Sequence, residues 1–213
     1  MEESTIKYGI MGGTFDPIHI GHLVLAEEVR NKLNLDKIIF IPSGNPPHKN
    51  SKNVTKSIHR YEMTLLATIS NPNFEISSVE IDKTGKTYTV DTIKDLRQKC
   101  KTNAEFYFIT GADSILDLPN WKNVNELLHL CKFVAATRPG FKLKKMEEKI
   151  KELEELHNKN IYTIIVTALQ ISSTDIRNRI REGNSVKYLL PETVEDYIYK
   201  NKLYVKKNYK ECW

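Results

Sequence analysis

Short apolar segments alternate with longer amphipathic segments along most of this chain. Six of the short segments are rich in Ile, Val, Phe and Tyr, which is typical of buried strands. They span residues 7–11, 37–42, 74–81, 105–110, 132–137 and 161–166. Strands that alternate with helices form mostly parallel sheets, because each crossover helix packs back onto the sheet. The pattern predicts an α/β, Rossmann-like fold with a mostly parallel sheet and helices on both faces.

Two helix starts are indicated by capping residues. Asn123 is followed three residues later by Glu126, a spacing typical of a capping box. Pro191 suits the first turn of a last helix over residues 191–202. The buried face of that helix is predicted to carry Val194, Tyr197 and Ile198.

A further helical repeat over residues 143–156 fits either a surface helix or a coiled-coil arm of a homo-oligomer. Two heptads are too few to specify a coiled coil, so we predict a helix packed on the sheet and leave the oligomeric state open. The chain has no internal repeat and no Pro/Gly-rich linker. We therefore expect one domain over residues 1–213, with residues 205–213 as a basic tail.

Composition narrows the class of protein. Hydrophobic residues make up 40% and charged residues 28% of the 213 residues, which argues against a disordered or collagen-like chain. No apolar run approaches the roughly 20 residues that cross a bilayer, and the acidic start lacks the basic region of a signal peptide. We expect a cytoplasmic protein without a membrane partner. Three scattered cysteines without a Cys-x-x-Cys pair predict buried thiols rather than disulfides or a zinc site.

The net charge is modest. The chain carries 32 Lys and Arg against 27 Asp and Glu, a formal charge of +5. This excess favours anionic ligands but lacks the clustering of a nucleic-acid surface, so we expect no nucleic-acid partner. Binding of nucleic acid through the basic tail remains the least favoured alternative, and it would require a steep salt dependence.

A glycine-rich segment, Gly-Gly-Thr-Phe-Asp-Pro-Ile-His-Ile-Gly-His over residues 12–22, follows the first predicted strand. Open parallel sheets bind ligands at the carboxyl ends of their strands. Gly12 and Gly13 let backbone amides approach a phosphate closely, and Thr14 adds a hydroxyl donor. The segment matches neither the Gly-x-Gly-x-x-Gly turn nor the Gly-x-x-x-x-Gly-Lys-Ser/Thr loop, so two common nucleotide folds lose support.

His19 and His22 lie three residues apart at the start of a predicted helix. At this spacing both imidazoles face the same place, where they can donate hydrogen bonds to a phosphate. Metal ligation, with Asp16 as the local carboxylate, and a structural role in capping or core packing remain open alternatives.

A second polar cluster, Ile-Ser-Ser-Thr-Asp-Ile-Arg over residues 171–177, also lies between a predicted strand and a predicted helix. Ser172 and Asp175 fit the Ser-x-x-Asp capping pattern, which can mark a helix start and nothing more. Hydroxyls at a helix start, with Arg177 one turn along, also suit a polyanion. With the glycine-rich segment, this cluster is predicted to enclose a phosphate chain.

These two segments together resemble the nucleotidylyltransferase superfamily, and more narrowly the bacterial nicotinate mononucleotide adenylyltransferases. Four intermediate blocks occur in the same order as in that family: Asn-Pro-Pro-His-Lys at 45–49, Thr-Tyr-Thr at 87–89, Gly-Ala-Asp at 111–113 and Leu-Pro-Asn-Trp-Lys at 118–122. The resemblance runs from about residue 8 to residue 204, nearly the whole chain.

The resemblance implies adenylyl transfer from ATP to nicotinate mononucleotide in NAD biosynthesis, with release of pyrophosphate and with Mg²⁺ accompanying ATP. It implies His19, His22 and Arg177 as the catalytic residues, and no metal ligands among the side chains. The ATP-binding residues that it implies are Gly12, Gly13, Thr14, Phe15, His19, His22, Arg138, Ser172, Ser173, Thr174 and Arg177.

For the acceptor mononucleotide, the resemblance implies Trp121 as a stacking face for the pyridine ring, although a Trp beside Pro is also a common core anchor. Donors near Thr87 and Tyr88 are expected to hold the carboxylate. Further expected contacts are Asn45, Lys49 and Asp113.

Two other functions remain open at this stage. A related adenylyltransferase would act on nicotinamide mononucleotide or phosphopantetheine instead. A non-catalytic nucleotide sensor would keep the fold without turnover, which the intact His19, His22 and Arg177 argue against.

Overall fold

The computed structural model describes residues 5–45, 54–100, 103–137, 161–167 and 169–206, together with residues 148, 150–152 and 155. The helix predicted over residues 143–156 and the tail beyond residue 206 therefore lie largely or wholly outside the described residues. None of the described helices combines the length and apolarity needed to cross a membrane.

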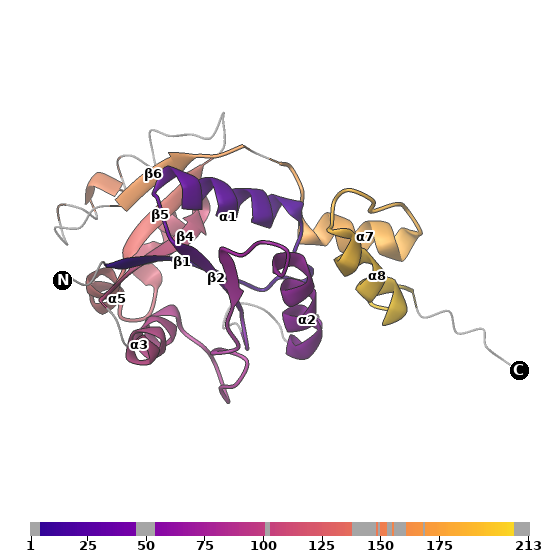
Figure 1. The fold of residues 1–213 in the computed structure, drawn as a ribbon, viewed down its shortest axis with the longest axis horizontal. Helices are drawn as coiled ribbons and strands as arrows, with labels where there is room; N and C mark the ends of the chain where they lie inside the picture. Colours follow the sequence, from indigo (N-terminus) through magenta and orange to yellow (C-terminus); the bar gives the residue numbers. More distant parts are fainter. Residues whose placement is uncertain are drawn as a thin grey trace, which may run out of the picture.

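Six strands form one sheet in the order β3-β2-β1-β4-β5-β6, and all neighbouring strands run parallel (Figure 1). The strands are β1 (Ile6–Gly13), β2 (Lys37–Pro42), β3 (Phe74–Ile76), β4 (Ala104–Gly111), β5 (Lys132–Thr137) and β6 (Ile161–Ile165). In this order β1 lies between β2 and β4. The loop that follows β1 therefore leaves the middle of the sheet at its carboxyl edge.

Helices cover both faces of the sheet, as the sequence pattern predicts. The helical elements are α1 (Ile20–Lys32), α2 (Ser57–Thr68), α3 (Thr89–Lys99), α4 (Ala112–Asp117), the 3₁₀ turn η2 (Leu118–Asn120), α5 (Val124–Leu130), α7 (Ser173–Glu182) and α8 (Glu192–Lys200). Helix α1 lies over one face, and α3 and α5 lie over the other (Figure 1). Helix α8 packs against α2.

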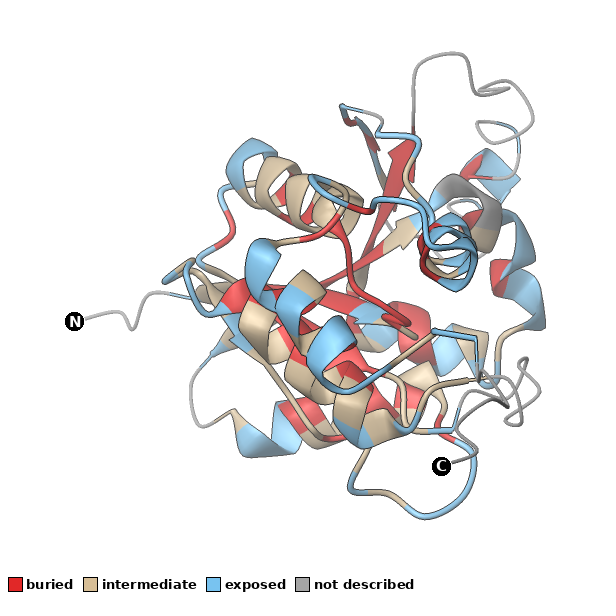
Figure 2. Cartoon of the chain, turned by 90° about the vertical axis from the view of Figure 1, so that its right-hand side faces the viewer, coloured by how far each residue is buried: buried red, intermediate tan, exposed pale blue. Residues whose placement is uncertain are grey.

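The core consists of two apolar layers, one on each side of the sheet. Successive strand residues point to opposite faces, so Met11 joins the layer that contains α1, whereas Ile10 joins the layer that contains α3 and α5. Phe40 and Ile39 of β2 divide in the same way. Buried residues gather along the strands and on the inner sides of the helices, whereas the outer helix surfaces are exposed (Figure 2).

Most predicted elements agree with the structure, with several strand ends shifted by one or two residues, and three features differ more clearly. The strand predicted over residues 74–81 ends at Ile76, because the chain turns over residues 78–82, where the Ile81 N–H donates to the Ser78 carbonyl. Asn123 precedes α5, but it adopts a left-handed φ of 51° and its side chain does not cap the helix. Pro191 lies one residue before α8, which ends at Lys200.

The cysteines agree in part with the predicted buried thiols. Cys131 is buried, and this burial raises the pKa of its thiol to about 12. Cys100 is half-buried and free, and Cys212 lies outside the described residues. A thiol with a raised pKa is a weak nucleophile at neutral pH, so Cys131 is best explained by packing.

Candidate active site

The segment after β1 folds back over its own glycines. Phe15 adopts a left-handed φ of 47° and is 3% exposed. A Cβ atom at Gly13 would lie 2.8 Å from the Phe15 ring, so only glycine fits beneath this ring. The Phe15 ring also meets the His22 ring edge to face, with ring centroids 5.1 Å apart. The glycines thus let the chain turn tightly and place its next residues beside the start of α1.

The two histidines lie together at the start of α1, as the spacing predicts. His19 is the residue before the helix, and its backbone N–H donates to Nδ1 of His22 at 3.2 Å. Their rings stack with centroids 3.7 Å apart and planes 30° apart. Because Nδ1 of His22 accepts this bond, the neutral ring carries its proton on Nε2. Nε2 of His22 is therefore a hydrogen-bond donor.

Both imidazoles are neutral at physiological pH. Burial lowers the pKa of His19 from 6.5 to about 4. Burial also lowers the pKa of His22 to about 3, with repulsion from His19 as a second cause. Nδ1 of His19 is buried without a hydrogen-bond partner among the described residues. The His19 side chain faces the backbone N–H of His22 in a capping-box arrangement, so the histidine pair also caps the start of α1, as the structural alternative predicts.

The second predicted segment forms the start of α7. The Ser172 hydroxyl accepts from the Asp175 N–H at 3.1 Å, so the predicted cap is present. Ser173 Oγ donates to the Pro17 carbonyl at 2.8 Å. Arg177 Nη1 donates to the Asp16 carbonyl at 2.7 Å. These long-range bonds bring α7 directly against the loop that carries the histidines.

Asp16, in the loop after β1, is buried at 4% exposure. Oδ1 accepts from the Tyr204 hydroxyl at 2.6 Å, and Oδ2 accepts from the Thr55 N–H at 3.3 Å. The Asp16 carboxylate is therefore held by one hydrogen bond at each oxygen, which fixes its position between the loop after β1 and the residues that follow α8. Among the described residues, no group of three or more His, Cys, Asp or Glu is placed to hold a metal ion.

Arg60 of α2 is a cation that is only 1% exposed. Its guanidinium donates to the carbonyls of Thr55 at 2.9 Å, Thr14 at 2.8 Å, and Ser43 at 2.6 Å, with a longer bond to Gly44 at 3.2 Å. Burial lowers the pKa of Arg60, while Asp16 acts in the opposite direction. Arg60 therefore ties the loop after β1 to the loop after β2.

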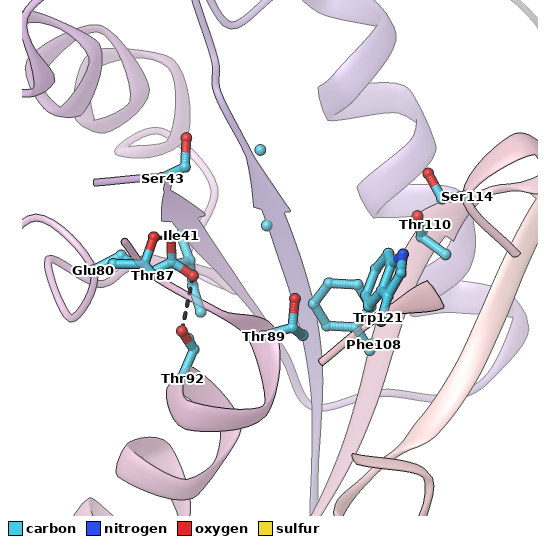
Figure 3. A pocket seen from close by; sticks show the side chains of 12 residues that line it. Ile41, Ser43, Glu80, Thr87, Thr89, Thr92, Phe108, Thr110, Ser114 and Trp121 are labelled. Atoms are coloured by element: carbon cyan, nitrogen blue, oxygen red, sulfur yellow. Dashed lines mark hydrogen bonds between the residues drawn. The ribbon is translucent and has the colours of Figure 1, made fainter. Parts of the chain in front are cut away.

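A pocket of about 250 Å³ opens at the carboxyl edge of the sheet (Figure 3). Its lining residues are Gly12, Gly13, Ile41, Ser43, Glu80, Thr87, Thr89, Thr92, Phe108, Thr110, Ser114 and Trp121. Gly12 and Gly13 thus border both the pocket and the histidine loop. The lining combines an aromatic wall with many hydroxyl groups, a chemistry that suits a flat polar ring.

One wall of the pocket is organised by Glu80. The hydroxyls of Thr87 and Thr92 donate to its two carboxylate oxygens, each at 2.8 Å. A Cβ atom at Gly44 would lie 2.0 Å from the Glu80 carbonyl, so the loop after β2 packs closely against this wall. Because Glu80 accepts the Thr87 proton, this hydroxyl can offer only lone pairs to a ligand.

The opposite wall is aromatic, as Figure 3 shows. Trp121 meets Phe108 edge to face, with centroids 5.7 Å apart and planes 88° apart. Trp121 also contacts Phe133 at a centroid distance of 6.3 Å. The indole is therefore both anchored in the core and partly open to the pocket.

Of the other predicted contacts, the structure describes Asn45 and Tyr88. Asn45 is exposed, and its carbonyl accepts a long bond from the Thr87 N–H at 3.5 Å. Tyr88 precedes α3 and lies under the Lys122 ammonium, 4.2 Å from the ring centroid. Lys49, Arg138 and the side chain of Asp113 lie outside the described residues.

Sequence reasoning missed Arg60, Glu80 and Ser43. Arg60 had a detectable signal, because it shares a helical face with Met63, Thr64 and Ala67, all of which are buried. An arginine on an apolar face indicates a buried charge that needs partners. Glu80 and Ser43 lie in irregular segments, where no periodicity indicates which side chains point inward.

Comparisons with known proteins agree with this geometry. A model of the cytidylyltransferase-like family matches residues 10–179. A relative from Thermoanaerobacter sp. (strain X514), described as a probable nicotinate-nucleotide adenylyltransferase, is 54% identical over 204 residues, 96% of this chain and 97% of its own. A relative from Moorella thermoacetica with the same description is 54% identical over 93% of this chain and 91% of its own.

A solved structure shares the fold. It is the Plasmodium falciparum nicotinic acid mononucleotide adenylyltransferase complexed with NaAD, with a TM-score of 0.73 and 24% identity over 93% of this chain and 97% of that chain. The family match extends from β1 into α7, and the relatives match along nearly their whole length. The chain therefore belongs to the cytidylyltransferase-like family and, within it, to the nicotinate-nucleotide adenylyltransferases.

Proposed function

We propose that this chain transfers the adenylyl group of ATP to nicotinate mononucleotide, releasing pyrophosphate and forming nicotinate adenine dinucleotide for NAD biosynthesis. One observation carries the proposal at the level of residues. The stacked pair His19 and His22 and the Asp16 carbonyl that holds Arg177 belong to the same loop after β1, and Gly12 and Gly13 of that loop line the pocket that contains Trp121. Two ligands bound on either side of these glycines would have their phosphates close together.

On the donor side, we assign the triphosphate to the gap between the loop after β1 and the start of α7. Nε2 of His22 would donate to a phosphate bound there, because its Nδ1 already accepts from the His19 N–H. Arg177 adds a fixed positive charge, which suits a phosphate. The other residues that we assign to ATP binding, as the family resemblance implies, are Gly12, Gly13, Thr14, Phe15, Ser172, Ser173, Thr174 and Arg138.

On the acceptor side, we assign the pyridine ring to the pocket, stacked on Trp121. The Thr87 hydroxyl donates its hydrogen bond to Glu80, so it is not free to donate to the carboxylate of the substrate. The Thr87 N–H already donates to the Asn45 carbonyl, so we assign the carboxylate to the backbone N–H groups of Tyr88 and Thr89 at the start of α3. Asn45, Lys49, Tyr88 and Asp113 stay predicted contacts of the mononucleotide.

In the reaction, an oxygen of the mononucleotide phosphate attacks the α-phosphorus of ATP, and the bond from that phosphorus to the β-phosphate oxygen breaks. The protein forms no covalent bond, so its contribution is positioning and stabilisation of charge. The neutral imidazoles and Arg177 would stabilise the negative charge that develops on the departing pyrophosphate. Loss of one such donor is expected to lower kcat about 10²- to 10³-fold.

Magnesium is expected to arrive with ATP. The described residues contain no cluster of carboxylates or histidines that would hold the ion alone, so its ligands would come mainly from the nucleotide phosphates. When bound, the ion supplies further neutralisation of phosphate charge.

The test is pyrophosphate release from ATP with three separate acceptors: nicotinate mononucleotide, nicotinamide mononucleotide and phosphopantetheine. We expect product with the first acceptor at a kcat/KM well above the other two. His19→Ala should reduce kcat while the protein stays folded. Absence of pyrophosphate with every acceptor would favour a nucleotide sensor, and preference for another acceptor would overturn the assigned substrate.

A further inference from the structure

Asp16 connects the donor site to a residue near the other end of the chain. The hydroxyl of Tyr204 donates to Oδ1 of Asp16 at 2.6 Å, although the two residues are 188 positions apart. The backbone carbonyl of the same Asp16 accepts from Arg177 Nη1 at 2.7 Å. Asp16 thus accepts a hydrogen bond from the Tyr204 phenol through its side chain and one from the Arg177 guanidinium through its backbone carbonyl.

Tyr204 is held firmly in this position. It follows α8 with a left-handed φ of 64°, and its ring packs against the core layer that contains α1 and α2. Its hydroxyl lies 4.0 Å from the Met63 sulfur. Burial raises the pKa of the phenol, and the charge of Asp16 raises it further. The hydroxyl therefore keeps its proton at physiological pH and remains a donor.

The Arg177 guanidinium has few other restraints. Among the described residues, its other hydrogen bond is a longer one, from Nη2 to Thr174 Oγ1 at 3.2 Å within the same helix. The bond to the Asp16 carbonyl is therefore the contact that joins Arg177 to the loop after β1. A shift of the Asp16 backbone would move the guanidinium away from the histidine pair.

We propose that Tyr204 is a positioning residue for the donor site, whose hydroxyl anchors Asp16 so that the Asp16 carbonyl holds Arg177 toward the phosphates of ATP. The proposal rests on the proposed function for the identity of the ligand. It assigns a role to the segment after α8, which the sequence motifs leave without one. Neither the phenol nor Asp16 touches the reacting atoms in this role.

A second tyrosine in the same part of the fold provides a matched control, which separates a positioning role of the Tyr204 hydroxyl from a purely structural one. The hydroxyl of Tyr197, on α8, bonds to Nδ1 of His59 on α2 at 2.9 Å. Tyr197→Phe removes one bonded hydroxyl from the packing of α8 on α2 without touching Asp16. Tyr204→Phe removes one bonded hydroxyl that does touch Asp16. Both variants keep the aromatic ring and its apolar contacts.

For each variant the experiment measures the Kd for ATP by calorimetry without acceptor, the kcat and the KM values for ATP and for nicotinate mononucleotide, and the Tm. We expect Tyr204→Phe to weaken ATP binding and lower kcat/KM for ATP about ten-fold, the size of one lost hydrogen bond near a charge. Its KM for the acceptor should change less than two-fold. Tyr197→Phe should leave all kinetic values unchanged, even where its Tm falls by as much.

The route through Arg177 is tested in the Arg177→Lys background. Lysine keeps a positive charge but lacks the planar fork that reaches the Asp16 carbonyl, so adding Tyr204→Phe there should change the ATP Kd less than two-fold. An unchanged ATP Kd in the single variant, an equal loss in Tyr197→Phe, or a full further loss in the Arg177→Lys background would each overturn the proposal. Failure of the proposed function is separate, because it would appear in the unmodified protein as absence of pyrophosphate release.

Discussion

The pair of the buried His19 and the half-buried His22 makes the stability of the protein depend on pH. Their pKa values are lowered by burial to about 4 and about 3, whereas an imidazole in the unfolded chain titrates near 6.5. Below pH 6.5 the unfolded chain binds protons that the folded protein does not bind. Stability from these groups is therefore complete above pH 6.5 and is lost progressively as the pH falls towards the folded-state values.

The size of the effect follows from proton linkage. At pH 5.5 each unfolded-state imidazole is about nine-tenths protonated, while both folded-state imidazoles stay almost neutral. Between pH 7.5 and 5.5 the free energy of unfolding should fall by about 1.3 kcal/mol for each histidine, about 2.7 kcal/mol for the pair. Any folded-state pKa below 4.5 gives nearly the same figure, because the unfolded-state protons dominate at pH 5.5.

The assay is urea unfolding at pH 7.5, 6.5 and 5.5 without nucleotide. The control is the double variant His19→Asn, His22→Asn, which keeps polar side chains but cannot titrate in this range. Carboxylates elsewhere contribute equally to both proteins, so the difference between the two pH profiles isolates the histidines. Parallel profiles, within about 0.5 kcal/mol, would show that the imidazoles are accessible to protons in the folded protein and would refute the reasoning.

Two further substitutions test the pocket and its support. Arg60→Ala removes hydrogen bonds to four carbonyls and should lower the free energy of unfolding by about 3 to 4 kcal/mol, measured by urea unfolding; a loss below about 1 kcal/mol would contradict the buried network. Trp121→Ala should raise the KM for the acceptor mononucleotide about ten-fold or more in initial-rate assays, while Trp121→Phe keeps a stacking face and most of the affinity. Equal acceptor KM values for the two Trp121 variants would exclude stacking.

Elements with a local signal were predictable from the sequence. Strands of a parallel sheet are buried on both faces, so they appear as continuous apolar runs, and β2 and β5 have the predicted bounds. The Ser172 cap was also predicted, because the hydroxyl and the N–H that it accepts from are only three residues apart. The histidine pair was placed correctly on one face for the same reason.

Features that depend on distant segments could not be predicted from the sequence. The burial of Arg60 is needed to join the carbonyls of Thr14 and Ser43, which lie in different loops. The low pKa values of the histidines arise from the atoms packed around them, not from their spacing. Asn123 failed as a cap because its side-chain amide donates to the Glu126 carboxylate instead of accepting from a backbone N–H, which the Asn-x-x-Glu spacing does not reveal.

The bond between Arg177 and the Asp16 carbonyl has a consequence for synthesis on the ribosome. The two partners are 161 residues apart, whereas every strand of the sheet precedes residue 166. A nascent chain that has exposed all six strands can form its sheet, but it cannot form the Arg177–Asp16 bond before α7 emerges. The contact between α7 and the loop after β1 therefore forms late in translation, so a polypeptide released before that point would keep its sheet and lack this contact.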